Sequence, residues 1–254
     1  MANERLRDAL LRTGITTTVL ADTLGVNPKT AERWVTTDRP PYPRHRHAIT
    51  RLVQESESYL WPNAIAPERT TQISESEVIH LYPRRSTVPG ELWSRLLDQA
   101  TEQISILAYA GLFFPEREPK LAKMLAAKAA NGCGVEILLG DPESHAVALR
   151  GSEEDVGDAM AAKIRNVLPF YRRLEGVEGV GIRYHETALY NSIYRFDDEM
   201  LVNTHAYGST AAFNPVLHLR RLPNGELFEF YAETFGRVWD TGRSIWSATG
   251  EHGG

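Results

Sequence analysis

Apolar residues recur at helical spacing in the first quarter of the chain and form short uninterrupted runs further on. Residues 3–12 place Leu6 and Leu10 on one side of a predicted helix, and residues 47–58 predict another. Between them, residues 17–24 carry Leu20 and Leu24 on a common face. This part of the chain is therefore predicted to be all-helical.

A tight turn is predicted after residue 24. Gly25 can adopt the left-handed conformation that ends a helix. Asn27 is a good N-cap, and Pro28 fits the first helical position, where its missing N–H costs nothing. Ala31 and Trp34 then return to the apolar face. Residues 16–34 (TTTVLADTLGVNPKTAERW) thus predict a helix, a turn and a second helix.

From residue 78 the pattern alternates between strands and helices. Strands are predicted at 78–82, 104–109, 135–139 and 181–185, and helices at 92–101, 119–131 and 155–174. A hairpin at 190–196 and 200–206, a strand at 216–221 and a helix at 227–239 follow. This alternation predicts an α/β domain with a mixed, largely parallel sheet.

Composition divides the chain at the same place. The predicted organisation is a helical domain at 1–62, a linker at 63–77 rich in Thr, Ser, Glu and Pro, an α/β domain at 78–246 and a disordered tail at 247–254. The single Cys133 excludes an intramolecular disulfide. No apolar run reaches the roughly 20 residues of a membrane span, and no signal peptide is recognisable, so we expect a cytoplasmic protein without a membrane partner.

Positive charge gathers around the predicted turn. The net charge is −5, yet residues 27–51 carry six Lys and Arg against two acids. Clustered cations suit phosphate contacts, and side chains at the start of the second helix suit base edges in the major groove. Prolines at 40, 41 and 43 predict that residues 38–44 form a rigid non-helical loop. The candidate DNA-binding residues are Asn27, Lys29, Thr30, Arg33, Arg39, Arg44, His45 and Arg46.

Residues 16–34, with the flanking segment 38–47 (DRPPYPRHRH), resemble the Xre/Cro-repressor-like helix-turn-helix domains. The resemblance implies that the N-terminal domain binds double-stranded DNA. The alternative is an αα-hairpin that packs against another domain, with the arginines in an ordinary solvated loop.

The second domain is similar in layout to one half of a phospholipase D-like fold. Residues 136–142 (EILLGDP) and 191–198 (NSIYRFDD) carry the similarity best. The whole chain resembles an actinobacterial type of regulator that joins an Xre-like domain to such a module. Because phospholipase D-like halves commonly pair, this resemblance implies a homodimer.

The catalytic motif of that superfamily, His-x-Lys-x4-Asp, is degenerate here. Alignment on Asp197 puts Tyr190 at the histidine position and Ser192 at the lysine position. Alignment on His185 puts Thr187 at the lysine position. Neither register supplies both the nucleophile and the phosphate-binding cation, so we expect no catalytic residues and no enzyme activity.

A catalytically inactive cleft can still bind a ligand. Polar-tipped aromatics, histidines and amides fall in one region of the predicted sheet, a mixture that suits a small-molecule effector. The candidate ligand-binding residues are Tyr184, His185, Tyr190, Asn191, Tyr194, Asn203 and His205. The alternative is that they are core residues. The spacing of His185 and His205 does not indicate a metal site, and no cofactor is expected.

These observations favour a dimeric transcriptional regulator. Two other functions remain open at this point: a phosphodiesterase or nuclease guided to DNA by the N-terminal domain, and an adaptor whose acidic second domain binds a protein.

Overall fold

A computed structural model describes residues 2–37, 39–62 and 73–246 of the chain. It divides into two compact units, one made of Met1–Glu77 with Leu222–Glu226 and one made of Val78–Arg221 with Leu227–Gly254. Residues 63–72 of the predicted linker and the predicted tail at 247–254 lie outside the described residues, whereas residues 73–77, also predicted as linker, are helical.

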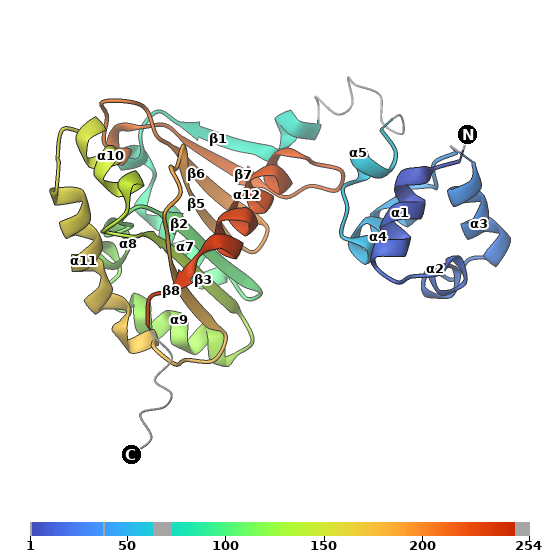
Figure 1. Cartoon of the computed structure of the whole chain (residues 1–254), viewed down its shortest axis with the longest axis horizontal. Coiled ribbons are helices and arrows are strands. Elements are labelled where there is room, and N and C mark those ends of the chain that lie inside the picture. The colour runs from blue at the N-terminus through green and yellow to red at the C-terminus, as the bar shows by residue number, and fades with distance from the viewer. Residues whose placement is uncertain (1, 38, 63–72, 247–254) are drawn as a thin grey trace, which may run out of the picture. The chain divides into compact units, whose positions relative to one another are not determined.

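The N-terminal unit is helical (Figure 1). Its described helices include α1 (Glu4–Arg12), α2 (Thr17–Leu24), α3 (Pro28–Thr36), α4 (Pro43–Val53) and α5 (Glu57–Leu60). Asn3, Thr16, Asn27 and Ser56 each cap the helix that follows by accepting a backbone N–H. Buried side chains from all five helices form one core, which includes Leu6, Leu20, Trp34, Ile49 and Leu60.

The fourth helix begins earlier than predicted. A helix was expected at 47–58 and a non-helical loop up to residue 44, but α4 starts at Pro43 and ends at Val53, where Gln54 has a φ of 55°. Proline blocks a helix only in its interior, and at the first position it removes no hydrogen bond. The prediction that residues 38–44 are entirely non-helical is therefore wrong, because Arg44 lies in the first turn of α4.

The second unit is built on an eight-stranded sheet with the strand order β1-β7-β6-β5-β2-β3-β4-β8. The strands are β1 (Val78–Tyr82), β2 (Gln103–Ala108), β3 (Gly134–Gly140), β4 (Val180–His185), β5 (Asn191–Phe196), β6 (Glu199–Thr204), β7 (Val216–Arg220) and β8 (Arg243–Ser244). The helices are α7 (Gly90–Gln99), α8 (Phe113–Arg117), α9 (Leu121–Ala130), α10 (His145–Glu153), α11 (Ala159–Tyr171) and α12 (Leu227–Thr241).

The sheet is mixed, but the prediction that it is largely parallel is wrong. Only the β2–β3 and β3–β4 pairs are parallel among the strand pairs of the described residues, and the other five are antiparallel. The parallel part ends at β2, because β2 pairs on its other side with β5. From β5 the sheet continues through antiparallel pairs to β6, β7 and β1.

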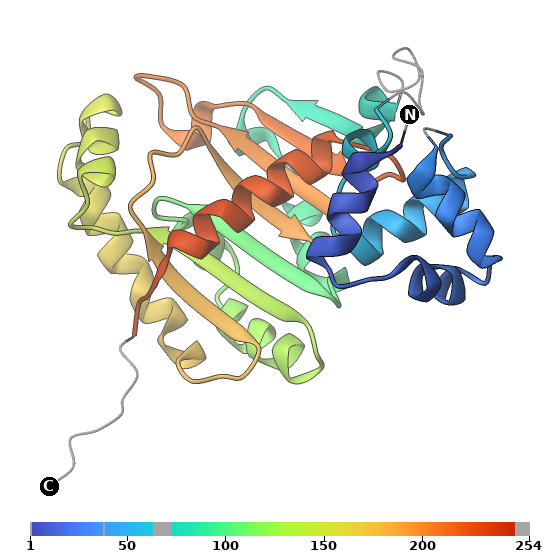
Figure 2. The same cartoon turned by 45° about the vertical axis from the view of Figure 1, so that its right-hand side comes forward.

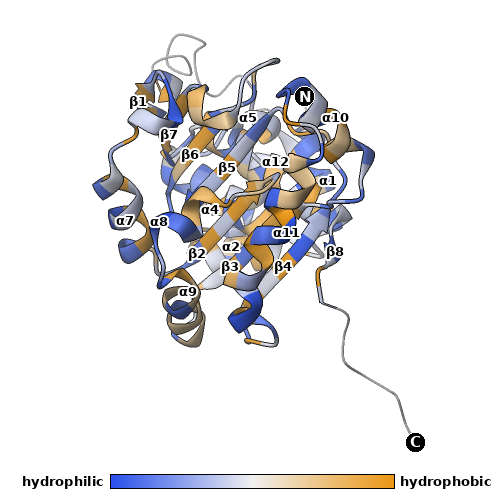
Figure 3. Cartoon of the chain, turned by 90° about the vertical axis from the view of Figure 1, so that its left-hand side faces the viewer, coloured by the Kyte–Doolittle hydropathy of each residue, from blue (hydrophilic) through white to orange (hydrophobic). Residues whose placement is uncertain are grey.

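Helices cover both faces of the sheet (Figure 2). Trp93 of α7, Phe114 of α8 and Leu125 of α9 belong to the core on one face. Phe228 and Phe235 of α12 belong to the core on the other. The central strands are among the most hydrophobic segments of the chain (Figure 3) because they are buried on both faces.

The long helix predicted at 155–174 begins later than predicted, as α11 (Ala159–Tyr171), and ends in a 3-10 turn at Arg172–Leu174. The helix before it, α10 (His145–Glu153), was not predicted. Asp155 and Gly157 between them have φ angles of 55° and 51°, a left-handed conformation that interrupts a helix. The helix predicted from residue 119 begins at Leu121, and the short α8 before it was not predicted.

Candidate nucleic-acid interface

The turn between α2 and α3 has the geometry that the sequence predicts. Gly25 ends α2 with a φ of 61°, and the Val26 N–H donates to the Ala21 carbonyl over 2.9 Å. Asn27 then caps α3, its Oδ1 accepting from the Lys29 N–H at 3.0 Å. These bonds fix where α3 begins, and therefore which of its side chains point outward.

The outward side of α3 is polar and cationic. Asn27, Lys29, Thr30 and Arg33 are exposed. On the inward side, Ala31, Trp34 and Val35 are buried. Four of the predicted DNA-binding residues therefore share one accessible helix face, the arrangement that reading a major groove requires.

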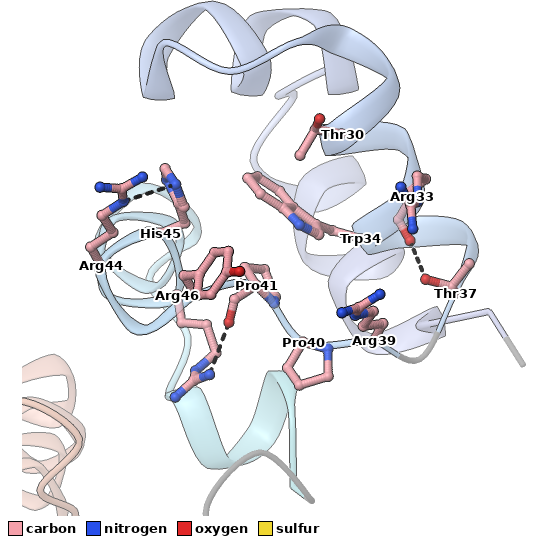
Figure 4. Close-up of a pocket in the computed structure, with 11 residues that line it drawn as sticks. Thr30, Arg33, Trp34, Thr37, Arg39, Pro40, Pro41, Arg44, His45 and Arg46 are labelled. Carbon is pink, nitrogen blue, oxygen red and sulfur yellow. Dashed lines mark hydrogen bonds between the residues drawn. The ribbon is translucent and has the colours of Figure 1, made fainter.

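A groove of about 560 Å³ lies beside this helix, between α3 and the first turn of α4 (Figure 4). The loop that joins the two helices supplies Arg39, Pro40, Pro41 and Tyr42 to it. In Figure 4 Arg44 and His45 lie on one side of the groove and Arg33 and Arg39 on the other. The described residues that line the groove are Thr30, Arg33, Trp34, Thr37, Arg39, Pro40, Pro41, Tyr42, Arg44, His45 and Arg46.

His45 is half-buried in this groove. Its Nε2 lies 3.2 Å from Arg44 Nε, which donates to it, and its ring lies 5.4 Å from the Trp34 ring. Burial, reinforced by the positive charge of Arg44, lowers the pKa of His45 below the ordinary histidine value. An anion in the groove would oppose both effects and favour the protonated imidazole.

Arg46 differs from the other predicted contact residues. It is only 8% exposed, forms an ion pair with the buried Glu57 of α5, and donates to the Pro41 carbonyl at 2.9 Å. Its charge is neutralised inside the unit, where it holds α4, α5 and the proline loop together. We therefore leave Arg46 out of the candidate interface, although the sequence alone grouped it with its exposed neighbours.

The seven residues of the predicted effector site do not share one environment. Tyr190 is 83% exposed, whereas Asn203 is fully buried. Tyr194 is fully buried among Trp93, Phe113 and Phe114, with ring centroids 5.1 to 6.4 Å away. Tyr194 is thus a core residue rather than part of an open pocket wall.

The two predicted histidines both lie beside one residue that the sequence analysis missed, Tyr109. The Tyr109 ring lies 5.9 Å from the ring of His185 and 5.7 Å from that of His205. Tyr109 directly follows β2, and the carboxyl end of a parallel strand is where α/β sheets place functional side chains. That position was the available signal.

Both histidines are held neutral. His185 Nε2 lies 3.3 Å from the Ala108 carbonyl, and His205 Nε2 lies 3.0 Å from Ser192 Oγ. Burial lowers the pKa of each to about 4, with the positive charge of Arg150 adding to the effect at His205.

Of the remaining predicted residues, Tyr184 lies beside Arg243, which pairs with Asp141, and Asn191 is half-buried at the start of β5. Asn203 donates to the Asn214 and Pro215 carbonyls, and its Oδ1 has no partner among the described residues. Of the seven predicted residues, the buried ones are thus His185, Tyr194 and Asn203, the half-buried ones are Tyr184, Asn191 and His205, and Tyr190 alone is exposed.

Two positions of the degenerate motif, Asp197 and Thr187, form hydrogen bonds that involve backbone N–H groups. Asp197 accepts N–H bonds from Thr101, Glu102 and Gln103 at the start of β2. Thr187 donates its N–H to His185 Nδ1.

Within the described residues, no group of three or more His, Cys, Asp or Glu side chains could hold a metal ion. No helix there combines the length and hydrophobicity needed to cross a bilayer.

Comparison with known proteins assigns no family. No family model and no curated protein matches the chain. One solved structure that matches is that of TrmBL2, described as an archaeal chromatin protein with a novel mode of DNA binding, at 14% identity and a TM-score of 0.41. The match covers 68% of this chain and 56% of that one. A TM-score of this size does not establish a shared fold.

Proposed function

We propose that this chain is a DNA-binding transcriptional regulator of the Xre-like helix-turn-helix type. The observation that carries the proposal is the exposed polar face at the start of α3, beside a groove that three exposed arginines line. Lys29, Thr30 and Arg33 meet base edges, and Arg39 and Arg44 meet backbone phosphates. The duplex is double-stranded DNA in its B form, whose major groove admits a helix.

The second unit, in this proposal, is a degenerate phospholipase D-like domain that forms a homodimer and binds a small effector. A dimer would place two copies of α3 on a two-fold symmetric operator. The nuclease alternative is less well supported, because Ser192 and Thr187 stand where a phosphate-binding lysine would be needed. No observation favours the adaptor alternative specifically.

The test measures binding of the full chain to duplexes from its own promoter region by fluorescence anisotropy at several salt concentrations. Arg33→Ala should reduce the preference for the best duplex over a random one, because it removes a base contact. Arg44→Ala should weaken both duplexes alike and reduce the salt slope by about one phosphate contact.

The matched control is Arg7→Ala, an exposed arginine on α1 that pairs with Glu4. It should change neither affinity nor preference. If the chain binds promoter duplexes no better than random ones, or if Arg7→Ala weakens binding as much as Arg44→Ala does, the proposal fails.

A further inference from the structure

The groove between α3 and α4 is larger than contact with a DNA phosphate requires. Its volume of about 560 Å³ lies in the range of small-molecule sites, about 300–1,000 Å³. A backbone phosphate of a duplex needs only a few donors on an open surface. The groove is therefore large enough to hold a small-molecule ligand.

The charge of the lining selects an anion. Arg33, Arg39 and Arg44 are exposed, and none of the described lining residues is an acid. The fourth arginine, Arg46, is already neutralised by Glu57. Guanidinium groups bind phosphate oxygens in a bidentate manner, and three of them around one space suit a group with more than one negative charge.

The remaining lining suits a planar ring. Trp34, Tyr42 and His45 are aromatic, and Pro40 and Pro41 are apolar. Tyr42 is 77% exposed, so its ring face is available for stacking. Aromatic side chains next to arginines are how proteins bind nucleobases, because every base has a π-face.

We propose that this groove binds a nucleoside phosphate, with the phosphates on Arg39 and Arg44 and the base against Tyr42 and His45. Because Thr30 and Arg33 belong both to the groove and to the proposed base-reading face, the bound nucleotide competes with DNA. The competition, though not the nucleotide site itself, rests on the proposed DNA-binding function. The N-terminal unit would then carry a regulatory site of its own.

The first experiment titrates the full chain with ATP, pyrophosphate and adenosine by isothermal calorimetry at constant ionic strength. ATP should bind saturably at one site per chain. Pyrophosphate and adenosine should each bind at least tenfold more weakly than ATP, because each contacts only part of the lining. Arg39→Ala and Arg44→Ala should each weaken ATP binding at least fivefold, and Tyr42→Ala should weaken ATP but not pyrophosphate. Arg7→Ala, outside the groove, should bind ATP as the unmodified chain does.

Several outcomes would overturn the nucleotide site. Equal affinity for pyrophosphate and ATP would mean a phosphate site without a base pocket. If the affinity for oligothymidylates increased with their length and exceeded the affinity for ATP, the groove would be a binding site for single-stranded nucleic acid. Absence of ATP binding in a chain with an unchanged circular dichroism spectrum would reject the site altogether.

The second experiment adds ATP to a preformed complex with labelled duplex. Release at ATP concentrations that match the calorimetric affinity supports competition, and an unchanged complex rejects it. If the chain binds ATP but no duplex, the proposed function fails while the nucleotide site stands. If it binds duplex but not ATP, the reverse holds.

Discussion

Asp197 stands at the turn between β5 and β6, and its carboxylate accepts backbone N–H bonds of 2.7 to 2.9 Å from Thr101, Glu102 and Gln103. Although burial acts to raise it, these hydrogen bonds hold the pKa of Asp197 below the ordinary aspartate value. The residue also has a φ of 50°, which aspartate tolerates better than most residues do. One side chain thus joins the hairpin to the start of the central strand β2.

Replacing Asp197 by alanine should therefore destabilise the second unit. The loss is expected to be about 1.5–3 kcal/mol, because three backbone N–H groups, two of them exposed and one half-buried, lose the charged acceptor that they share. Urea unfolding followed by circular dichroism measures it. The matched control is Asp198→Ala, the exposed neighbour that pairs with Arg221, which should cost less than about 1 kcal/mol. Equal effects of the two substitutions would contradict the assigned role of Asp197.

Among the elements, those with a sharp local signal could be predicted from the sequence. Gly25, Asn27 and Pro28 fix the turn before α3 through their own backbone chemistry, and the structure reproduces it. The predicted start of α4 was wrong, because a proline in the sequence suggests a helix end unless it is known to occupy the first position of a helix. Neighbouring residues give no signal of strand direction, which depends on distant pairing such as that of β2 with β5.

The candidate site shows the same limit. Exposure of Lys29 and Arg33 follows from helical spacing, so the outward face of α3 could be predicted. The burial of Arg46 could not, because it depends on Glu57 in another helix. Tyr109 was missed because its neighbours His185 and His205 come from strands that lie far away in the sequence.

The turn before α3 also gives a test at the level of elements. Gly25→Ala should destabilise the N-terminal unit by about 1 kcal/mol, because a Cβ is unfavourable at a φ of 61° although no neighbour lies within 4 Å of it. Gly236→Ala, inside α12 and equally free of neighbours, should instead stabilise by about 0.5–1 kcal/mol. Thermal unfolding of both variants measures this. The same sign for both would show that the left-handed conformation is not the cause.

At the scale of the whole molecule, charge is distributed unevenly between the two units. Cations concentrate between Asn27 and Arg51 in the first, while the second carries most of the acids. The second also contains the neutral histidines His185 and His205, whose pKa values of about 4 lie far below the ordinary value of 6.5. Its stability is therefore coupled to pH.

The second unit should lose stability as the pH falls from 6.5 towards 4. In that range the unfolded chain binds protons at His185 and His205 that the folded chain does not bind, so acid favours unfolding. By pH 5 the loss is expected to reach about 2 kcal/mol for each histidine. Urea unfolding at pH 7 and pH 5 measures it. His205→Gln should reduce the difference, and His47→Gln, at an exposed position, should not; an unchanged midpoint would contradict the neutral state.

The strand order has a consequence for synthesis on the ribosome. Helices α1 to α5 share one core made within the first 61 residues, so they can pack together while the rest of the chain is still being made. β1 is the first strand of the second unit to be made, yet its partner in the sheet is β7, which is made only after β2 to β6. Until β7 has been synthesised, the backbone hydrogen-bonding groups of β1 lack their partner strand. Slow translation of residues 83–215 would therefore prolong the time in which β1 can bind chaperones or aggregate.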